Sequence, residues 1–228
     1  MVKYHNMKLK VKPYWNKFFL KNKNIIEKIL DTLDYQHKII LPPKNQIFRA
    51  FEYSDIPECK LCLIGQDPYT SNNNNFYYAD GLAYSVDSSI TKLPGSLQNI
   101  FKELKNCYPE FDYSHGSLER WVKEENVILL NSSLTVIVDH PKSHTKRWKD
   151  FTDKIIQELD STSNCIFLLV GQSIINKSIL IRNKKRIITC CDPSSLGAHR
   201  GFIGSKIFLK INQLLKELGQ KEINFQIH

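Results

Sequence analysis

Short apolar runs and amphipathic stretches alternate four times along this chain, beginning at residue 60. The apolar runs cover residues 60–64, 127–130, 165–170 and 186–189. Apolar residues at helical spacing mark the amphipathic stretches near 96–105, 148–159, 173–181 and 206–218. Almost wholly apolar strands that alternate with helices are typical of a parallel sheet covered on both faces. The pattern predicts an α/β fold: a three-layer α/β/α sandwich around a four-stranded, mainly parallel sheet.

The organisation of the chain indicates one domain. No interior linker or repeat divides its 228 residues, so we predict a single domain over 1–228. Within it, an N-terminal helical segment, 1–57, is expected to pack on an α/β core, 58–228. Helical spacing covers 15–33, and a second short helix is expected near 47–51. The asparagine run at 72–75 looks like a polar loop insertion.

Basic residues outnumber acidic ones. The chain has 32 Lys and Arg against 23 Asp and Glu, a net charge of +9. This favours a polyanionic partner such as nucleic acid, although a solvated basic surface gives the same count. No window is long and apolar enough for a membrane span, and the opening residues lack the apolar core of a secretory signal. We therefore expect no membrane partner, and the cytoplasm in a bacterium or the nucleus or an organelle otherwise.

Six cysteines are too few for a disulfide scaffold in a chain of this length. Cys59 and Cys62 form one C-x-x-C pair, and a closed zinc site needs a second pair of ligands. Only the adjacent Cys190 and Cys191, with His199, could supply it. We expect core or near-core thiols and no metal.

Polar residues follow each apolar run, at the points where the predicted strands end. The loops are Gly-Gln-Asp-Pro-Tyr at 65–69, Asn-Ser-Ser at 131–133, Gly-Gln-Ser at 171–173 and Cys-Cys-Asp-Pro-Ser-Ser-Leu at 190–196. In parallel sheets, ligands bind outside the carboxyl ends of the strands, so these loops are expected to meet at one edge. Any one of them alone could be an ordinary turn. Four together indicate a functional site.

These loops carry recognisable motifs: GQDPY at 65–69, LLNSSLTV at 129–136, SHTKRWKDFTD at 143–153 and DPSSLGAHRGF at 192–202. Their order and spacing resemble those of the family 1 uracil-DNA glycosylases, from about residue 15 to the end. The resemblance implies a monomeric enzyme of base-excision repair that flips uracil out of DNA and hydrolyses the bond joining it to deoxyribose. It implies no cofactor or metal, and uracil-containing DNA, single- or double-stranded, as the partner.

The resemblance also implies roles for individual residues. Asp67 matches the carboxylate that orients the attacking water and stabilises the sugar cation. Asn131 matches the amide that accepts from uracil N3–H and donates to O4, a pattern that cytosine reverses. Tyr69 would exclude the thymine methyl group, Tyr84 would stack on the flipped base, and Gln66 would line the base site. A turn aspartate, a backbone-capping asparagine and core tyrosines are the alternatives.

Four further residues match DNA contacts. Leu196 corresponds to the leucine that fills the hole left by the flipped base, and Ser96, Ser194 and Arg200 to contacts with the phosphates. His144, Lys146 and Arg147 could add positive charge nearby. Taken singly, the serines could be helix caps or turn residues, and the leucine could fold onto the core.

The sequence departs from the family pattern at the leaving group. Asp192 stands where the family has a histidine that donates to uracil O2, and an ionised carboxylate cannot donate. A proton shared between Asp67 and Asp192 would restore a donor; otherwise turnover is slow. Thr70 and Gln172 also replace usual residues. These changes keep open a second hypothesis, a degenerate DNA-binding or replication-accessory protein.

Overall fold

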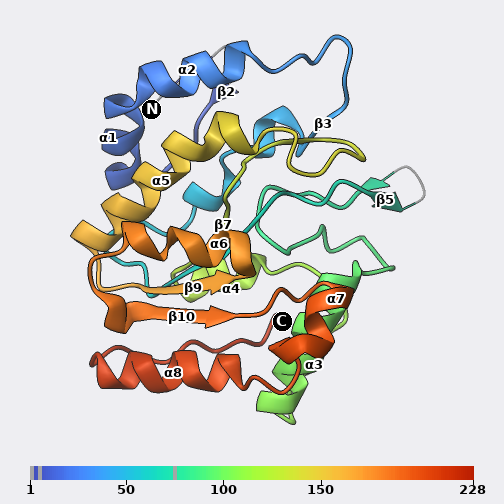
Figure 1. The fold of residues 1–228 in the computed structure, drawn as a ribbon, viewed down its shortest axis with the longest axis vertical. Helices are drawn as coiled ribbons and strands as arrows, with labels where there is room; N and C mark the ends of the chain where they lie inside the picture. The colour runs from blue at the N-terminus through green and yellow to red at the C-terminus, as the bar shows by residue number, and fades with distance from the viewer. Residues whose placement is uncertain (1–2, 5–6, 74–75) are drawn as a thin grey trace.

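The computed structural model describes residues 3–4, 7–73 and 76–228, with side chains from residue 9 onward except at 72 and 73. Its centre is a four-stranded sheet in the order β10–β9–β4–β7, in which every neighbouring pair is parallel. The strands are β4 (Leu61–Gly65), β7 (Val127–Asn131), β9 (Ile166–Val170) and β10 (Ile187–Cys190). Each lies within one residue of its predicted run. Figure 1 shows the β10 arrow pointing toward the segment that contains α7.

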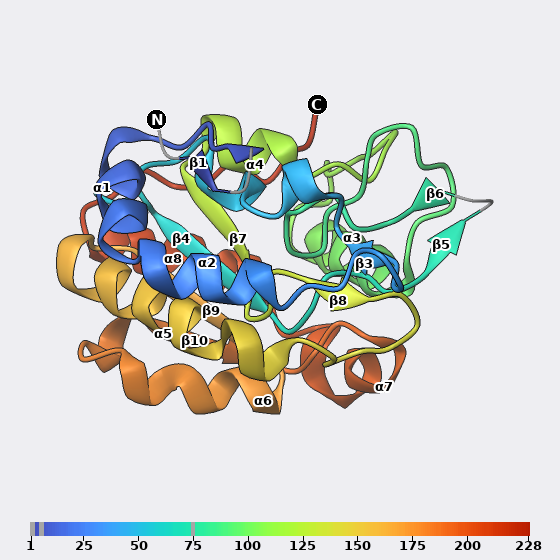
Figure 2. The same cartoon turned by 90° about the horizontal axis from the view of Figure 1, so that it is seen from above.

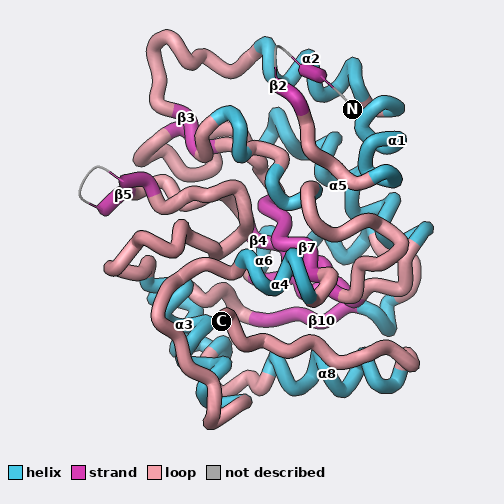
Figure 3. The backbone as a smooth tube through the Cα atoms, turned by 180° about the vertical axis from the view of Figure 1, so that it is seen from behind, coloured by secondary structure: helices cyan, strands magenta, loops and turns pink. Residues whose placement is uncertain are grey.

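Helices cover both faces of this sheet, as the predicted three-layer sandwich requires. Seen from above in Figure 2, the strands lie between α5 (Thr145–Thr162) with α6 (Gln172–Ile175) and α4 (Glu119–Glu124). Figure 3 shows α4 from its own side, near the sheet. The remaining long helices are α3 (Gly95–Cys107) and α8 (Ile207–Glu217). β4, β7 and β9 are buried throughout, which explains their nearly continuous apolar sequence.

The helical spacing over 15–33 forms two helices instead of one, α1 (Pro13–Lys21) and α2 (Lys23–Asp31). Asn22 interrupts them with φ −105° and ψ 16°. Its backbone N–H is shared between Phe18 O and Phe19 O, and its side chain donates to Phe18 O at 2.9 Å. The side-chain bond adds a second donor on Phe18 O at the end of α1, and an asparagine side chain readily makes such a local bond.

Several short elements complete the chain. Tight 3₁₀ turns, η1 (Lys44–Gln46) and η2 (Arg49–Phe51), occupy the place of the helix expected near 47–51. The helix expected over 173–181 ends early and continues as η3 (Asn176–Leu180). The other pieces are β1 (Lys3–Tyr4), β2 (Met7–Lys8), β3 (Ile40–Leu41), β8 (Val136–Ile137), η4 (Lys184–Arg186), α7 (Ser195–Gly197) and η5 (Ala198–Phe202).

Part of the predicted polar loop at 72–75 is a strand. β5 (Asn72–Asn73) pairs antiparallel with β6 (Phe76–Tyr77), while Asn74 and Asn75 lie outside the described residues. The prediction followed the polar composition of the asparagine run, although the aromatic residues that follow it favour a strand. The insertion is therefore a hairpin arm.

One buried apolar cluster joins the N-terminal helices to the sheet. Trp15, Phe19 and Phe151 are fully buried, and the Phe19 and Phe151 rings meet edge to face at 5.6 Å. The expected core thiols Cys59, Cys62 and Cys165 are buried in the same cluster. Burial raises the pKa of the Cys59 and Cys62 thiols. No helix in the described part of the chain is long and apolar enough to cross a membrane.

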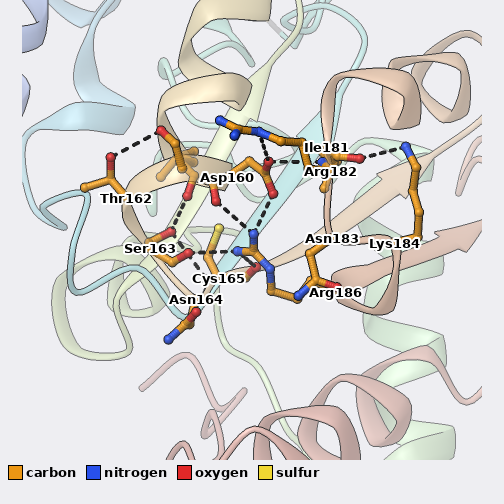
Figure 4. Close-up of polar contacts among 12 residues, drawn as sticks. Asp160, Thr162, Ser163, Asn164, Cys165, Ile181, Arg182, Asn183, Lys184 and Arg186 are labelled. Carbon is orange, nitrogen blue, oxygen red and sulfur yellow. Dashed lines mark hydrogen bonds and ion pairs between the residues drawn. The ribbon is translucent and has the colours of Figure 1, made fainter.

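A buried arginine lies at the amino ends of β9 and β10, opposite the polar loops. Arg186 donates to Ser163 O, Cys165 O and both the carbonyl and carboxylate of Asp160, with distances from 2.5 to 3.1 Å (Figure 4). The second carboxylate oxygen of Asp160 accepts from the Arg182 N–H at 3.0 Å. These bonds offset much of the cost of burying the ion pair, although Arg186 Nε has no hydrogen-bond partner among the described residues.

Candidate active site

The polar loops meet in one pocket of about 170 Å³ at the carboxyl edge of the sheet. Its lining comes from the loop after β4, the loop after β10, the segment before α3 and the first turn of α3. Every lining residue was a predicted site residue: Gln66, Asp67, Tyr69, Tyr84, Ser96 and Asp192. The structure therefore brings six of the ten candidates around one cavity.

Asn131 ends β7 beside Gly65 of β4 and is not among the residues that line the pocket. It is opposite Gly65 in the register and only 5% exposed. A Cβ atom on Gly65 would stand 3.2 Å from both Asn131 Oδ1 and the Tyr84 ring, so glycine permits their close approach. The Ser132 N–H donates to Gly65 O at 2.8 Å and ties the two loops together. Within the described chain, no hydrogen bond occupies the Asn131 amide.

Asp67 has one carboxylate oxygen held and the other free. Its Oδ2 accepts from the Lys142 N–H at 3.1 Å, whereas Oδ1 is buried with no hydrogen-bond partner among the described residues. Burial raises the pKa of Asp67, and the Lys142 N–H and the Thr145 hydroxyl partly oppose that shift. Thr145 Oγ1 is likewise buried with no hydrogen-bond partner among the described residues. A carboxylate that lines a pocket can accept a proton from an incoming water.

The two tyrosines are held by backbone rather than by side-chain partners. The Tyr69 hydroxyl donates to Tyr84 O at 3.1 Å, and Tyr84 has a left-handed φ of 65°, an outlier for a bulky residue. Burial, followed by the negative charge of Asp192, raises the pKa of Tyr84. Both phenols remain neutral near pH 7 and line the pocket.

An ion pair fixes the loop that carries Tyr84. Asp80 accepts from Arg49 at 2.8 Å, from the Leu82 N–H at 3.0 Å and from Ser85 Oγ at 2.8 Å. Gly81 makes the turn at φ 90°, where a Cβ would lie 2.1 Å from Gln46 O. The sequence analysis did not identify Arg49 or Asp80; the Asp-Gly pair was the available turn signal. That turn signal could not show that Arg49 is the cation that pairs with Asp80.

Gln66 and Asp192 are both engaged by neighbouring loops. Gln66 Oε1 accepts from Ser173 Oγ at 2.6 Å, and Asp192 Oδ1 accepts from the Ser194 N–H at 2.8 Å. Asn99 of α3 donates to Pro193 O at 2.8 Å and fixes the loop after β10. Asp192 therefore acts as a turn residue as well as a wall of the pocket. Asn99 was a positioning residue that the sequence analysis missed.

The remaining candidates lie on the loop and helix that follow Asp192, outside the pocket lining. Leu196, in α7, is 73% exposed. Ser194 is half-buried, and Arg200 is exposed on η5. In the part of the chain that the structure describes, no group of three or more His, Cys, Asp or Glu residues is arranged to hold a metal.

His144 does not supply the positive charge expected of it. It is 1% exposed, and its Nδ1 meets Thr135 Oγ1 at 2.9 Å. Thr135 Oγ1 also accepts from Trp148 Nε1 at 2.6 Å, so the hydroxyl links the two buried rings. Burial, aided by Arg147 and Lys38, lowers the pKa of His144 to about 4. His144 is therefore a neutral structural residue near pH 7.

This burial predicts acid sensitivity. The unfolded chain protonates His144 near pH 6.5 and the folded chain only near 4, so stability is lost as pH falls between them. We expect the free energy of unfolding at pH 5 to fall by about 2 kcal/mol on this account. Urea unfolding at pH 7 and pH 5 should show a smaller decrease for His144→Gln than for the wild type. The exposed His140→Gln is the control, and an undiminished decrease in His144→Gln contradicts the assignment.

A parallel α/β/α sandwich with a carboxylate, an amide and two aromatic faces at its carboxyl edge defines an enzyme class that receives a planar base. The sequence model described as the uracil DNA glycosylase superfamily matches residues 51–216. The uracil-DNA glycosylase of Coxiella burnetii (strain CbuG_Q212) is 42% identical over 213 residues, covering 91% of this chain and 90% of the relative. That of Alkaliphilus oremlandii (strain OhILAs) is 41% identical over 197 residues, covering 85% of each. The chain belongs to the uracil-DNA glycosylase superfamily.

Solved structures agree on the fold. The crystal structure of mimivirus uracil-DNA glycosylase is similar with a TM-score of 0.87 at 24% identity, covering 95% of this chain and 87% of the other. This similarity extends through the N-terminal helices as well as the sheet.

Proposed function

We propose that this protein hydrolyses the N-glycosidic bond between uracil and deoxyribose in DNA, leaving an abasic site for base-excision repair. The observation that carries the proposal is a pocket at the carboxyl edge of the sheet that is lined by Asp67, Tyr69 and Tyr84, with the Asn131 side chain close beside it at Gly65. All these groups come from one chain, which supports a monomeric enzyme. We place it where the DNA is, in the cytoplasm of a bacterium or the nucleus or an organelle otherwise.

Asp67 acts on the sugar. Cleavage breaks the bond between C1′ and N1 of uracil, leaving cationic character on the sugar and negative charge on the base. The Asp67 carboxylate orients a water, accepts its proton as the oxygen bonds to C1′, and stabilises the cation electrostatically. The Lys142 N–H on the other oxygen keeps the carboxylate in one orientation.

Asn131 and the tyrosines select the base. With its amide free of protein partners, Asn131 can accept from N3–H through Oδ1 and donate to O4 through Nδ2. Cytosine offers the reverse pattern and leaves buried groups unpaired, a mismatch that costs about 10⁴-fold or more. Tyr69 occupies the wall where a 5-methyl group would project, Tyr84 supplies a stacking face, and Gln66 completes the wall.

DNA is held outside the pocket. Leu196 is exposed on the loop that leaves the pocket wall, and an apolar side chain there can enter the stack when the base leaves it. Ser96, Ser194 and Arg200 contact the phosphates in this proposal, and the net charge of +9 attracts the polyanion. These contacts offset the few kcal/mol needed to extrude a base.

Asp192 lowers the expected rate. Its carboxylate lines the pocket and faces negative charge that develops on the leaving uracil. The proposal is therefore an enzyme slowed by this residue. An accessory protein without chemistry is not favoured, because DNA binding alone gives no role to a carboxylate that lines the pocket with its pKa raised by burial.

The test is release of free uracil from single- and double-stranded oligonucleotides in buffer containing EDTA. We expect release of uracil from uracil-containing DNA. Matched oligonucleotides with thymine or cytosine at the same position should lose that base at least about 10⁴-fold more slowly. Salt-dependent DNA binding without any uracil release would contradict the proposal and favour the accessory protein.

A further inference from the structure

Phe76 is a large aromatic side chain that this fold leaves in water. It is 67% exposed, on the return strand β6 of the hairpin arm formed by β5 and β6. Burying a phenylalanine is worth about 1.5–3 kcal/mol, so its position outside the core forgoes stabilisation. Scattered exposed apolar residues are common, and exposure alone assigns no role. The packing that anchors the arm, and the side of the molecule from which the arm projects, do indicate a role for Phe76.

The arm is fastened to the wall of the pocket. Side chains alternate along a strand, so Tyr77 turns inward while Phe76 points out. Tyr77 packs against the small buried cluster of Leu41, Ala79 and Val136. The next ring, Tyr78, meets Tyr69 edge to face at 5.9 Å, and Tyr69 lines the base pocket. The Tyr78 N–H donates to Ser71 O across the arm.

The arm and Leu196 project from the same edge of the molecule. Figures 1 and 2, which differ by a quarter turn, both place β5 and α7 on the side opposite α1. Leu196, in α7, is 73% exposed on the loop that follows the pocket residue Asp192. The stretch from 70 to 78 carries no acidic residue, so it does not repel phosphates. DNA bound along this edge can contact both the arm and α7.

We propose that Phe76 stacks on a base of the DNA strand next to the flipped nucleotide, as a second apolar contact beyond Leu196. The inference rests on the proposed function, because it takes DNA as the occupant. Flipping unstacks the neighbouring base and exposes its face, and an aromatic ring offers a replacement of similar shape. The arm therefore extends the DNA-binding surface beyond the pocket.

Kinetics give the first test. Stacking on one base contributes about 1–3 kcal/mol, so Phe76→Ala should raise KM for single-stranded uracil DNA about 10-fold and leave kcat within 2-fold. Phe76→Tyr should retain wild-type KM, and Phe76→Leu should resemble Phe76→Ala, because the ring and not its apolarity is required. Unchanged KM in Phe76→Ala overturns the inference while uracil release still supports the glycosylase.

Fluorescence gives a test independent of catalysis. All three native tryptophans, Trp15, Trp121 and Trp148, are fully buried, so Phe76→Trp adds the one exposed indole among the described residues. With Asp67→Asn keeping the uracil in place, DNA should quench that indole. Leu20→Trp, on the far helix α1, is the control and should not respond. Base stacking by residue 76 is overturned if the quenching persists when the flanking nucleotides are abasic. It is also overturned if saturating DNA causes no quenching.

Discussion

Asp67→Asn should reduce uracil release about 10³-fold with little change in DNA affinity. The amide has nearly the shape of the carboxylate, but it neither accepts a proton from water nor carries the charge that stabilises the sugar cation. The Lys142 N–H can still bond to the amide oxygen, so the loop keeps its position. Single-turnover excision rates and a binding isotherm on the same oligonucleotide measure the two quantities.

Stability provides the control for this variant. Burial raises the pKa of Asp67, so its ionised form is less favourable in the folded protein than in the unfolded chain. The stabilisation associated with the proton is present at low pH and is lost as pH rises through the folded pKa. At pH 7 a neutral asparagine should therefore leave the thermal midpoint equal to or above that of the wild type. Full activity in Asp67→Asn eliminates the assigned mechanism.

Asp192→His should increase uracil release about 10²-fold at neutral pH. The imidazole can donate a hydrogen bond to uracil O2 as charge develops there, and a single such donor is worth about 10²- to 10³-fold. The exchange also removes a negative charge from the wall of the pocket. The same single-turnover assay, from acidic to neutral pH, measures the change.

Asp192→Asn separates the two effects. It removes the charge, can still accept from the Ser194 N–H and offers a weak donor, so its rate should lie between those of the wild type and Asp192→His. The hypothesis of a proton shared with Asp67 makes a different prediction, a wild-type rate that rises toward acidic pH and a variant that loses this rise. A slower Asp192→His at every pH shows that Asp192 takes part in catalysis as it stands.

The alternation of apolar runs and amphipathic stretches in the sequence was sufficient to predict the fold without tertiary information. Strands buried on both faces, as β4, β7 and β9 are, must be apolar along their whole length, so their ends could be located to within one residue. Boundaries set by side chains were harder to locate. The break at Asn22 depends on one amide returning to Phe18 O, and an apolar spacing count does not register it.

The sequence by itself determined the layers of the sheet, the edge at which the polar loops gather and the residues that line the pocket. Those features follow from strand polarity and from motif order along the chain. Only the tertiary structure decided that Asp67 keeps one oxygen free, that Arg49 holds Asp80, that His144 is neutral and that Phe76 stays in water. Each depends on burial by residues distant in sequence, and local pattern contains no record of such contacts.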